Sequence, residues 1–364
     1  MTRIVNGETH LAEVDLVIEP GSFNVLLGRT RAGKTSLLRV MAGLDHADGG
    51  TLGWGDRDVT DLGVRERDVA MVYQMFVNYP SLTVYDNIAS PLRARRHLSA
   101  SARDAKVREV AALLGLTPFL SRLPAELSGG QQQRTAIARA LAKDASLVLL
   151  DEPLANLDYK LREELRRELR KLFDAGGATV VYATAEPDEA LLLGGRTIVL
   201  DEGRVLQVGP ALDVYLEPNS QRVSENFSDP QLNVIDLEVS ETGRGRLGSE
   251  AELSLPAPLS SLSKGRYRAG IRANHLRLQR QSSEDLRLVA TALVDEVTGS
   301  STLVHTACGE ITLTAQLPGI HRHPLGSSIE LFVAPDRLLL FDLQGRRIGP
   351  LSSSSTIPAA HGTY

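Results

Sequence analysis

One stretch of the sequence has the residue types and the spacing that bind phosphate groups. It follows the pattern G-x-x-x-x-G-K-[ST] without a gap and consists of Gly28, Arg29, Thr30, Arg31, Ala32, Gly33, Lys34, Thr35 and Ser36. In such a loop, backbone amides and the positive end of the next helix face the phosphates. The lysine reaches the outer phosphates, and the hydroxyl after it can ligate Mg²⁺. The sequence therefore predicts a nucleotide site in which Lys34 is the phosphate cation and Thr35 a Mg²⁺ ligand.

The surroundings of this stretch are those that a phosphate loop requires. The apolar run 23–27 predicts a buried strand, and residues 34–41, followed by Gly43, predict a helix. A glycine-bearing turn that matches the pattern by chance would lack this order of strand, loop and helix, so we favour the nucleotide site. Arg29 and Arg31 are unusual, because they place two bulky cations where many such loops carry small residues.

A second segment predicts another helix end that can bind an anion. Residues 127–134 read LSGGQQQR and precede a run of good helix formers. Ser128 can cap the helix, and two glycines let backbone amides approach a ligand closely. The residues assigned to this segment are Ser128, Gly129, Gly130 and Gln131.

Polar side chains follow two apolar runs. Residues 147–150 end in Asp151 and Glu152, and residues 69–73 end in Gln74. Adjacent carboxylates at the end of a buried strand suit one group to a Mg²⁺ shell and the next to a water nucleophile. Alone, a strand-end Asp-Glu is mostly a solvated turn, and Gln74 is more typical of a polar edge residue. Beside a nucleotide bound by the phosphate loop, Glu152 and Gln74 become candidate catalytic residues, and Thr35, Gln74 and Asp151 candidate metal ligands.

Taken in order, these motifs resemble the ATP-hydrolysing subunit of ATP-binding cassette (ABC) transporters, and more narrowly the subunits that drive carbohydrate, polyol and glycerol-type importers. The turn 154–158, which ends at Asp158, completes the series. The resemblance covers residues 1 to about 218 and continues more weakly to about 342. It implies ATP and Mg²⁺ as cofactors, a place for Asp158 at the nucleotide, and a head-to-tail dimer. Each nucleotide would then lie between one phosphate loop and the other subunit's 128–131 segment.

The resemblance and the strand patterns together predict the fold class and the domains. We expect an α/β P-loop ATPase domain with a helical subdomain, followed by an all-β domain of the OB type (transport-associated). The predicted boundaries are residues 1–217 for the ATPase domain with the helical subdomain at about 86–135, 218–234 for a linker, 235–345 for a regulatory or dimerisation barrel, and 346–364 for a disordered, serine-containing tail.

Two positions depart from the family pattern. Relatives usually read Thr-His-Asp after the strand 178–183, whereas this chain reads Thr184, Ala185 and Glu186, so the histidine that would touch the γ-phosphate is absent. Near Val5, where relatives place an aromatic residue on the adenine, His10 is a partial substitute. Two functions stay open: a hydrolysing subunit that powers an importer, or a weakly hydrolytic subunit that completes the site of a different cassette ATPase. The missing histidine favours a heterodimer.

Composition limits the remaining possibilities. A formal net charge of -5 and an aromatic content of 4% give no reason to expect nucleic acid as a partner. The single cysteine, Cys308, excludes an internal disulfide. No signal peptide or membrane span is expected, so a membrane role requires partners. These would be transmembrane permease subunits, a second cassette ATPase and, indirectly, a periplasmic or extracellular solute-binding protein. The predicted location is the cytoplasmic face of the inner (plasma) membrane, as a peripheral subunit.

Overall fold

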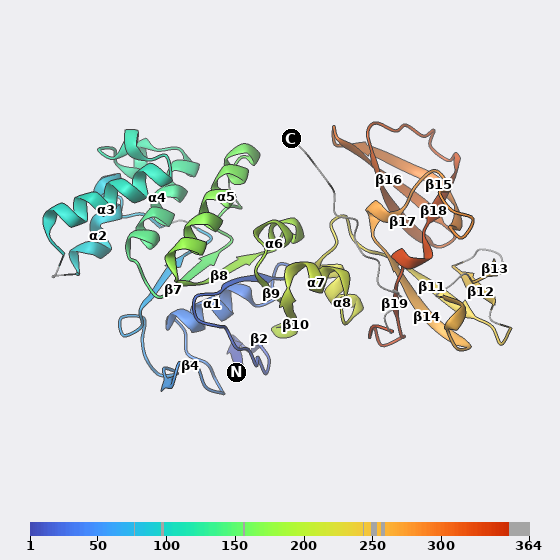
Figure 1. Cartoon of the computed structure of the whole chain (residues 1–364), viewed down its shortest axis with the longest axis horizontal. Coiled ribbons are helices and arrows are strands. Elements are labelled where there is room, and N and C mark those ends of the chain that lie inside the picture. Colours follow the sequence, from blue (N-terminus) through green and yellow to red (C-terminus); the bar gives the residue numbers. More distant parts are fainter. Residues whose placement is uncertain are drawn as a thin grey trace. The chain divides into compact units, whose positions relative to one another are not determined.

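The computed structural model describes residues 1–75, 77–95, 98–155, 157–242, 244–248, 253–255 and 259–348. The chain divides into two compact units, Met1–Val214 and Tyr215–Tyr364 (Figure 1). The first unit combines helices with a mainly parallel sheet, and the second is built mostly of antiparallel strands. Within the described part of the chain, no helix combines the length and the apolar character that a membrane crossing requires.

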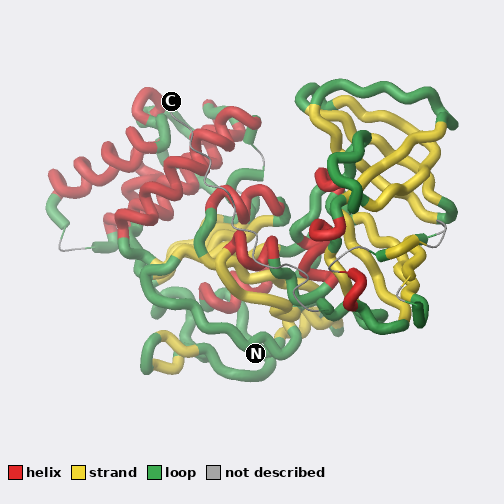
Figure 2. The backbone as a smooth tube through the Cα atoms, turned by 45° about the vertical axis from the view of Figure 1, so that its right-hand side comes forward, coloured by secondary structure: helices red, strands yellow, loops and turns green. Residues whose placement is uncertain are grey.

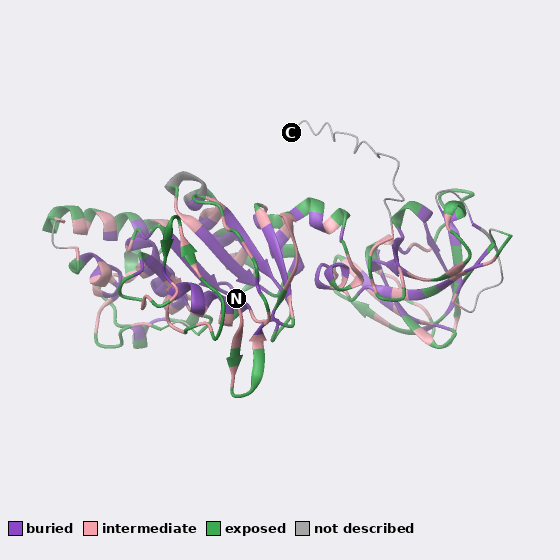
Figure 3. Ribbon diagram, turned by 90° about the horizontal axis from the view of Figure 1, so that it is seen from below, coloured by how far each residue is buried: buried purple, intermediate pink, exposed green. Residues whose placement is uncertain are grey.

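The first unit is organised around a six-stranded sheet with the order β10-β9-β3-β8-β7-β6. Its strands are β3 (Phe23–Leu27), β6 (Val69–Val72), β7 (Leu147–Asp151), β8 (Thr179–Thr184), β9 (Arg196–Asp201) and β10 (Arg204–Pro210). All neighbours are parallel except β9 and β10. Strands inside the first unit are coloured as buried in Figure 3. Every residue of β3 and β7 is buried, which explains why residues 23–27 and 147–150 are unbroken apolar runs. Two short hairpins lie outside this sheet, β1 (Arg3–Val5) with β2 (Glu8–Leu11) and β4 (Gly53–Trp54) with β5 (Arg57–Asp58).

Helices pack on both faces of this sheet. Leu37 and Leu38 of α1 (Lys34–Ala42) belong to one apolar cluster with Leu26 of β3. On the opposite face, Phe173 of α5 (Tyr159–Gly176) contacts Phe23, with 6.0 Å between the ring centroids. Because successive side chains of a strand point to opposite faces, residues 23 and 26 reach different helices. The parallel strands therefore end at one edge of a sheet that is covered on both sides.

Most of the remaining helices of the first unit come one after another between β6 and β7, and Figure 2 shows helices and strands in different colours. The remaining helices are α2 (Val84–Arg93), α3 (Ala100–Leu113), η1 (Thr117–Phe119), η2 (Pro124–Glu126), α4 (Gly129–Ala142), α6 (Pro187–Leu193) and α7 (Ala211–Leu216), which spans the boundary between the units. The hydroxyls of Thr83 and Ser99 accept from the backbone at the starts of α2 and α3. These caps satisfy amides that have no partner within their helix, and so they define where each helix begins.

The second unit contains a five-stranded sheet, β13-β12-β11-β14-β19, and a four-stranded sheet, β17-β16-β15-β18. Its elements are α8 (Gln221–Asn226), β11 (Asn233–Val239), β12 (Arg244–Leu247), β13 (Leu253–Ser254), η3 (Leu259–Ser261), β14 (Gly265–Ile271), η4 (Ala273–His275), β15 (Leu286–Val297), β16 (Ser301–Cys308), β17 (Ile311–Pro318), β18 (Ser328–Val333), η5 (Pro335–Arg337) and β19 (Leu339–Phe341). Along β15, buried and exposed residues alternate from Leu286 to Ala292. The buried faces of both sheets share one apolar cluster, an arrangement that fits an OB-type domain.

The predicted fold class is confirmed: an ABC-type α/β ATPase domain precedes an all-β domain of the OB type. The predicted domain boundaries stay predictions. The units divide between Val214 and Tyr215, and residues 221–226 of the predicted linker form α8. At the start of the predicted tail, the Arg347 amide donates to the Asn219 carbonyl oxygen at 2.9 Å. Residues 349–364 of that tail lie outside the described residues.

Candidate functional site

A cleft of about 810 Å³ lies where the phosphate loop follows β3. Its lining combines residues of the loop, of the β1–β2 hairpin, of α1 and of the segments that follow β6 and β7. The lining residues are Arg3, Val5, Glu8, Thr9, His10, Thr30, Arg31, Ala32, Gly33, Lys34, Thr35, Ser36, Arg39, Asp45, Gln74 and Glu152. The structure thus gathers most of the predicted phosphate loop, Gln74 and Glu152 in one place, because their parallel strands end at the same edge.

The two glycines of the pattern are required by their own chain. A Cβ on Gly28 would lie 2.4 Å from the Leu200 carbonyl oxygen. A Cβ on Gly33 would lie 2.5 Å from the His10 carbonyl oxygen, and Gly33 has a φ of 103°. Backbone therefore passes too close for a side chain at either position. Lys34 then begins α1, so the loop amides and the helix end share one concave surface.

Lys34 is buried, and its ammonium group has three partners. It donates to the carbonyl oxygens of Gly28 at 2.7 Å and Arg29 at 3.2 Å, and it lies 3.1 Å from Oε1 of Glu152. Gln74 Nε2 donates to the other carboxylate oxygen of Glu152 at 2.8 Å. Glu152 is thus held between the lysine of the loop and the glutamine after β6. The sequence predicted all three residues at the site, but their contacts only emerge from the folded chain.

Asp151 lies behind this group, at the end of β7, and is 2% exposed. Its Oδ2 accepts from the Thr35 hydroxyl at 2.8 Å, while its Oδ1 is buried without a hydrogen-bond partner. Burial raises the pKa of the Asp151 carboxyl, the Thr35 hydrogen bond opposes this shift, and the Glu152 charge adds to it. A bound cation would offset the cost of this buried charge.

These oxygens fit the ligands that Mg²⁺ takes beside a nucleotide. Such an ion is held by one or two carboxylates and other oxygen donors, with phosphates and water completing its shell. Thr35 Oγ1 and Asp151 Oδ1 offer oxygens of the required kind, and the Gln74 amide follows the neighbouring strand. The described residues contain no group of three or more His, Cys, Asp or Glu that could hold a metal by itself. A nucleotide-dependent Mg²⁺ site needs no such group.

Sequence reasoning missed three contacts of the cleft. His10 Nδ1 lies 2.9 Å from Ser36 Oγ, which fixes the β1–β2 hairpin beside α1. Arg39 forms two hydrogen bonds with Asp45, at 2.9 and 2.8 Å. The third is the Lys34 pair with Glu152 described above. No local pattern predicts these contacts. The one available signal was that Arg39 and Asp45 carry opposite charges and lie six residues apart, on either side of the end of α1. Val5 and His10 both line the cleft, and its described lining residues include no Phe, Tyr or Trp.

The segment 128–131 does not contribute to this cleft. Ser128 caps α4 and forms a reciprocal pair with Gln131: Gln131 N donates to Ser128 Oγ at 3.4 Å, and Ser128 N donates to Gln131 Oε1 at 3.0 Å. Ser128 and Gly129 are exposed. Asp158 also lies outside the lining and caps α5, where its Oδ1 accepts from Leu161 N at 3.0 Å. Both predicted nucleotide contacts are therefore available only to a ligand or partner from outside this cleft.

Ala185 directly follows β8 and is exposed. The phosphate loop begins beside it, because Gly28 N donates to the Thr184 carbonyl oxygen at 3.2 Å. Glu186 is bound away from the cleft by Arg162, whose Nη1 donates to both carboxylate oxygens at 2.7 and 2.8 Å. Position 185 thus lies at the edge that holds the cleft, with a methyl group and no side-chain donor.

A model of the ABC transporter family matches residues 11–155 of this chain. Over 338 residues the chain is 36% identical to the sn-glycerol-3-phosphate import ATP-binding protein UgpC of Chromobacterium violaceum, which covers 93% of this chain and 90% of that protein. The chain belongs to the ATP-binding subunits of ABC transporters. Other members include the trehalose/maltose import ATP-binding protein MalK of Thermococcus litoralis, at 36% identity over 93% of this chain and 95% of that protein. The sulfoquinovosyl glycerol transport ATP-binding protein SmoE of Agrobacterium fabrum is 37% identical over 95% of both.

Among solved structures, a dimeric ATP-binding cassette in a post-hydrolysis state with ADP and Pi is similar to this chain. The TM-score is 0.53 at 31% sequence identity, over 58% of this chain and 95% of the cassette. As an ABC ATP-binding subunit, this protein is a nucleotide-binding ATPase of the import type. The recognition of the family from its ordered motifs is confirmed.

Proposed function

We propose that this subunit hydrolyses ATP in the cleft at Lys34 and uses the cycle to drive import of a sugar, a polyol, glycerol or a glycerol phosphate. The observation that carries the proposal is the convergence of Lys34, Glu152 and Gln74 within hydrogen-bond distance at the edge of the parallel sheet. The solute class rests on the names of the relatives, which are import ATP-binding proteins for sn-glycerol-3-phosphate and for trehalose/maltose and a transport ATP-binding protein for sulfoquinovosyl glycerol.

The contacts of Glu152 suggest how ATP prepares the site. In the structure, the Lys34 ammonium neutralises Glu152 at 3.1 Å. Nucleotide phosphates carry more negative charge than one carboxylate and compete for the same lysine. Glu152 is then free to accept a proton from an attacking water, while Gln74 keeps its carboxylate in place. Bound Mg²⁺, held by Thr35, Asp151 and Gln74, would neutralise charge on the phosphates.

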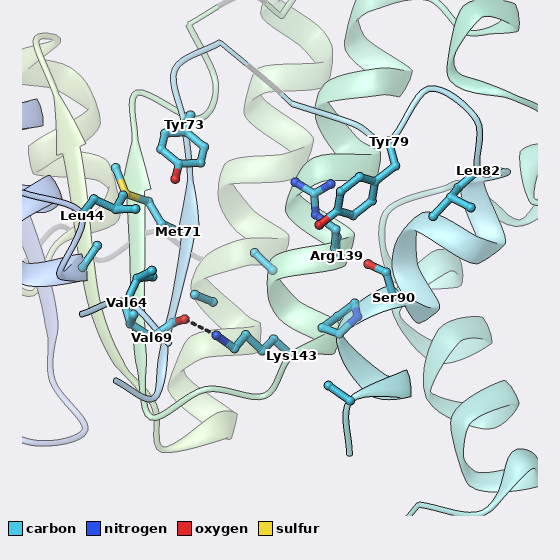
Figure 4. A pocket seen from close by; sticks show the side chains of 15 residues that line it. Leu44, Val64, Val69, Met71, Tyr73, Tyr79, Leu82, Ser90, Arg139 and Lys143 are labelled. Carbon is cyan, nitrogen blue, oxygen red and sulfur yellow. Dashed lines mark hydrogen bonds between the residues drawn. The ribbon is translucent and has the colours of Figure 1, made fainter. Parts of the chain in front are cut away.

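The proposal includes a surface for the permease subunits. A groove of about 510 Å³ lies between β6, α2 and α4, lined mostly by apolar side chains (Figure 4). Arg139 stacks on the Tyr79 ring, and Lys143 Nζ donates to the Val69 carbonyl oxygen at 2.6 Å. Tyr79, which lines the groove, is 49% exposed, and Met75, two residues after the lining residue Tyr73, is 82% exposed. Exposed apolar groups beside a groove favour docking of an apolar permease segment. Gln74 lines the cleft and Tyr79 lines the groove, so residues of the two sites lie only five positions apart in the sequence.

The 128–131 segment supports a head-to-tail dimer within the transporter. It presents exposed helix-end groups but does not line the cleft of its own chain, so a second cassette subunit would supply the matching phosphate loop. Because Ala185 has no side-chain donor, we propose that the second subunit is a different chain whose site is complete. A solute-binding protein outside the membrane would deliver the solute, and this subunit would sit peripherally on the cytoplasmic face.

The variant Glu152→Gln tests this function in the transporter purified from its native cells. It removes the proton acceptor but keeps the shape of the side chain, so hydrolysis at this chain's own site should slow about 10²–10⁴-fold, and the turnover of the whole transporter should fall by the share of that site. Mg-ATP binding to the isolated subunit should be at least as tight as in the wild type, since Lys34 loses a competing charge. Phosphate release measures the turnover, and calorimetry measures Mg-ATP binding. Glu109→Gln, on the exposed side of α3, serves as the control and should change neither. Unchanged turnover in Glu152→Gln would show that this site does not hydrolyse ATP.

A further inference from the structure

Arg31 has a backbone conformation that suits glycine. It lies in the phosphate loop between Gly28 and Gly33, and its φ is 68°. In this left-handed region the Cβ of an L residue approaches the following carbonyl oxygen, which costs energy. Glycine would form the same turn without that cost. The arginine side chain is exposed and lines the cleft. A strained residue with a long charged side chain at a ligand cleft is a reason to look for a function of that side chain.

The other cations of the cleft are already paired. Arg3 lies 3.3 Å from Asp48, Lys34 lies 3.1 Å from Glu152, and Arg39 makes its two hydrogen bonds with Asp45. Arg31 is the fourth Lys or Arg in the lining. It alone among the four has no hydrogen bond or ion pair from its side chain to any residue that the structure describes. Its guanidinium is therefore the uncommitted positive charge of this cleft.

We propose that Arg31 is a second phosphate cation, whose guanidinium binds phosphate oxygens of the nucleotide beside Lys34. The inference rests on the proposed ATP site, and it extends that site from the backbone of the loop to one particular side chain. A guanidinium presents donors in a planar fork that matches phosphate oxygens, and it is weakly hydrated, so it gives up water more readily than an ammonium. The energy lost to the left-handed backbone is offset when the nucleotide binds.

This role also bears on the missing donor at position 185. The loop begins at the end of β8, since Gly28 N donates to the Thr184 carbonyl oxygen at 3.2 Å, and Ala185 follows directly. Arg31 therefore adds a cation to the same edge of the sheet at which Ala185 offers none. In this chain, a phosphate donor from the loop takes over part of what a side chain after β8 would supply.

Two neutral variants separate the charge of Arg31 from its backbone. Arg31→Gly removes the strain of the left-handed backbone conformation. Arg31→Asn introduces a neutral side chain on a residue type that tolerates this conformation. Calorimetry on the isolated subunit should show Mg-ATP affinity about 10- to 100-fold weaker in both variants, because a charge-assisted contact is lost. The melting temperature of the nucleotide-free variants should equal or exceed that of the wild type. Affinity should also depend less on salt, since one cation fewer binds the phosphates. Arg31→Lys should keep part of the affinity.

Two further variants make the result decisive. Glu13→Gly changes another residue with positive φ, 53°, outside the lining of the cleft, and should bind Mg-ATP as the wild type does. Lys34→Ala reports on the ATP site itself. Wild-type affinity in Arg31→Gly and Arg31→Asn, with binding lost in Lys34→Ala, would overturn the role of Arg31 and leave the ATP site standing. Equal binding by wild type and Lys34→Ala would instead overturn the ATP site. Weaker ATP binding together with a lower melting temperature in both neutral variants would assign Arg31 a structural role and reject the proposal.

Discussion

The phosphate loop and the 128–131 segment are both glycine-containing starts of helices, but the protein surrounds them very differently. In the loop, a Cβ on Gly33 would lie 2.5 Å from a backbone oxygen of the β1–β2 hairpin. At Gly129, a Cβ would meet nothing within 4 Å. The fold of this chain therefore explains why position 33 is glycine, but it does not explain why position 129 is glycine. Several other glycines of this chain, such as Gly49 and Gly299, are equally unobstructed, so the open space at Gly129 permits the proposed site shared with another subunit without requiring it.

The polar groups of the two segments differ in the same way. In the loop, Lys34 and Thr35 bind groups that come from β7 and the residue after it, far away in the sequence. In the other segment, Ser128 and Gln131 satisfy each other across one helical turn. One segment is held by tertiary contacts, whereas the other is self-contained and free to meet a partner.

The largest effect should come from Gly33→Ala. The added methyl group meets the His10 carbonyl oxygen, and alanine does not favour a φ of 103°. The free energy of unfolding should fall by about 2–5 kcal/mol from strain and overpacking together. Denaturant unfolding of the isolated subunit measures this change, and nucleotide binding should be lost with it. If Gly33→Ala unfolded at the same denaturant midpoint as the wild type, the β1–β2 hairpin would not restrict position 33, and the contrast with position 129 would disappear.

Gly129→Ala should have the opposite profile. Alanine favours a helix over glycine by about 0.5–1 kcal/mol, and nothing in the chain obstructs its methyl group, so the isolated subunit should be as stable as the wild type or slightly more stable. ATP turnover of the assembled transporter should nevertheless fall at least about tenfold, because a methyl group obstructs close approach of the partner's nucleotide. Phosphate release by the purified transporter checks this.

Two outcomes bear on that comparison. Full transporter activity in Gly129→Ala would show that this helix end does not touch a nucleotide. A matched control is Gly299→Ala, in the turn before β16, where a Cβ also meets nothing within 4 Å. At its φ of 96° alanine is strained, so this variant should lose stability but keep turnover when folded.

The smallest effect should come from Asp151→Asn. Burial raises the pKa of this carboxyl, so its ionised form destabilises the nucleotide-free protein. The amide can still accept from the Thr35 hydroxyl, and at neutral pH the variant should be more stable by about 1 kcal/mol. The pKa of Asp151 is higher in the folded protein than in the unfolded chain. The ionised carboxyl therefore lowers the stability of the wild type at pH values above the folded-state pKa, and this loss of stability vanishes as the pH falls below the unfolded-state pKa. The gain should therefore disappear in acid.

Unfolding of both proteins across this pH range tests the sign, and Mg²⁺ provides a second readout. Mg²⁺ should strengthen ATP binding by the wild type but much less by Asp151→Asn, since the amide lacks the negative charge. A variant that is less stable than the wild type at neutral pH would show that Asp151 is stabilised by its neighbours even without the cation.

Much of this architecture was predictable from the sequence because its signals are local. The unbroken apolar runs 23–27 and 147–150 became fully buried strands, and the strand patterns expected in the C-terminal region became the antiparallel sheets of the second unit. The loop residues were found through their spacing, and Gln74 and Glu152 through their place in the order of motifs; most of these residues line one cleft. The lining by Arg3, Arg39 and Asp45 was not predicted, since no short-range pattern connects them with the loop.

The sequence by itself determined the order of the motifs, the element types and the family, because these depend on residues close together in the chain. Only the tertiary structure decided which groups meet. The register that pairs Leu27 with Thr184, and Val72 with Leu150, brings four strand ends to one edge. That register results from packing between strands far apart in the sequence. This register brings the Glu152 carboxylate into an ion pair with Lys34 and leaves the Arg31 side chain without a partner among the described residues. Neither result can be derived from a motif.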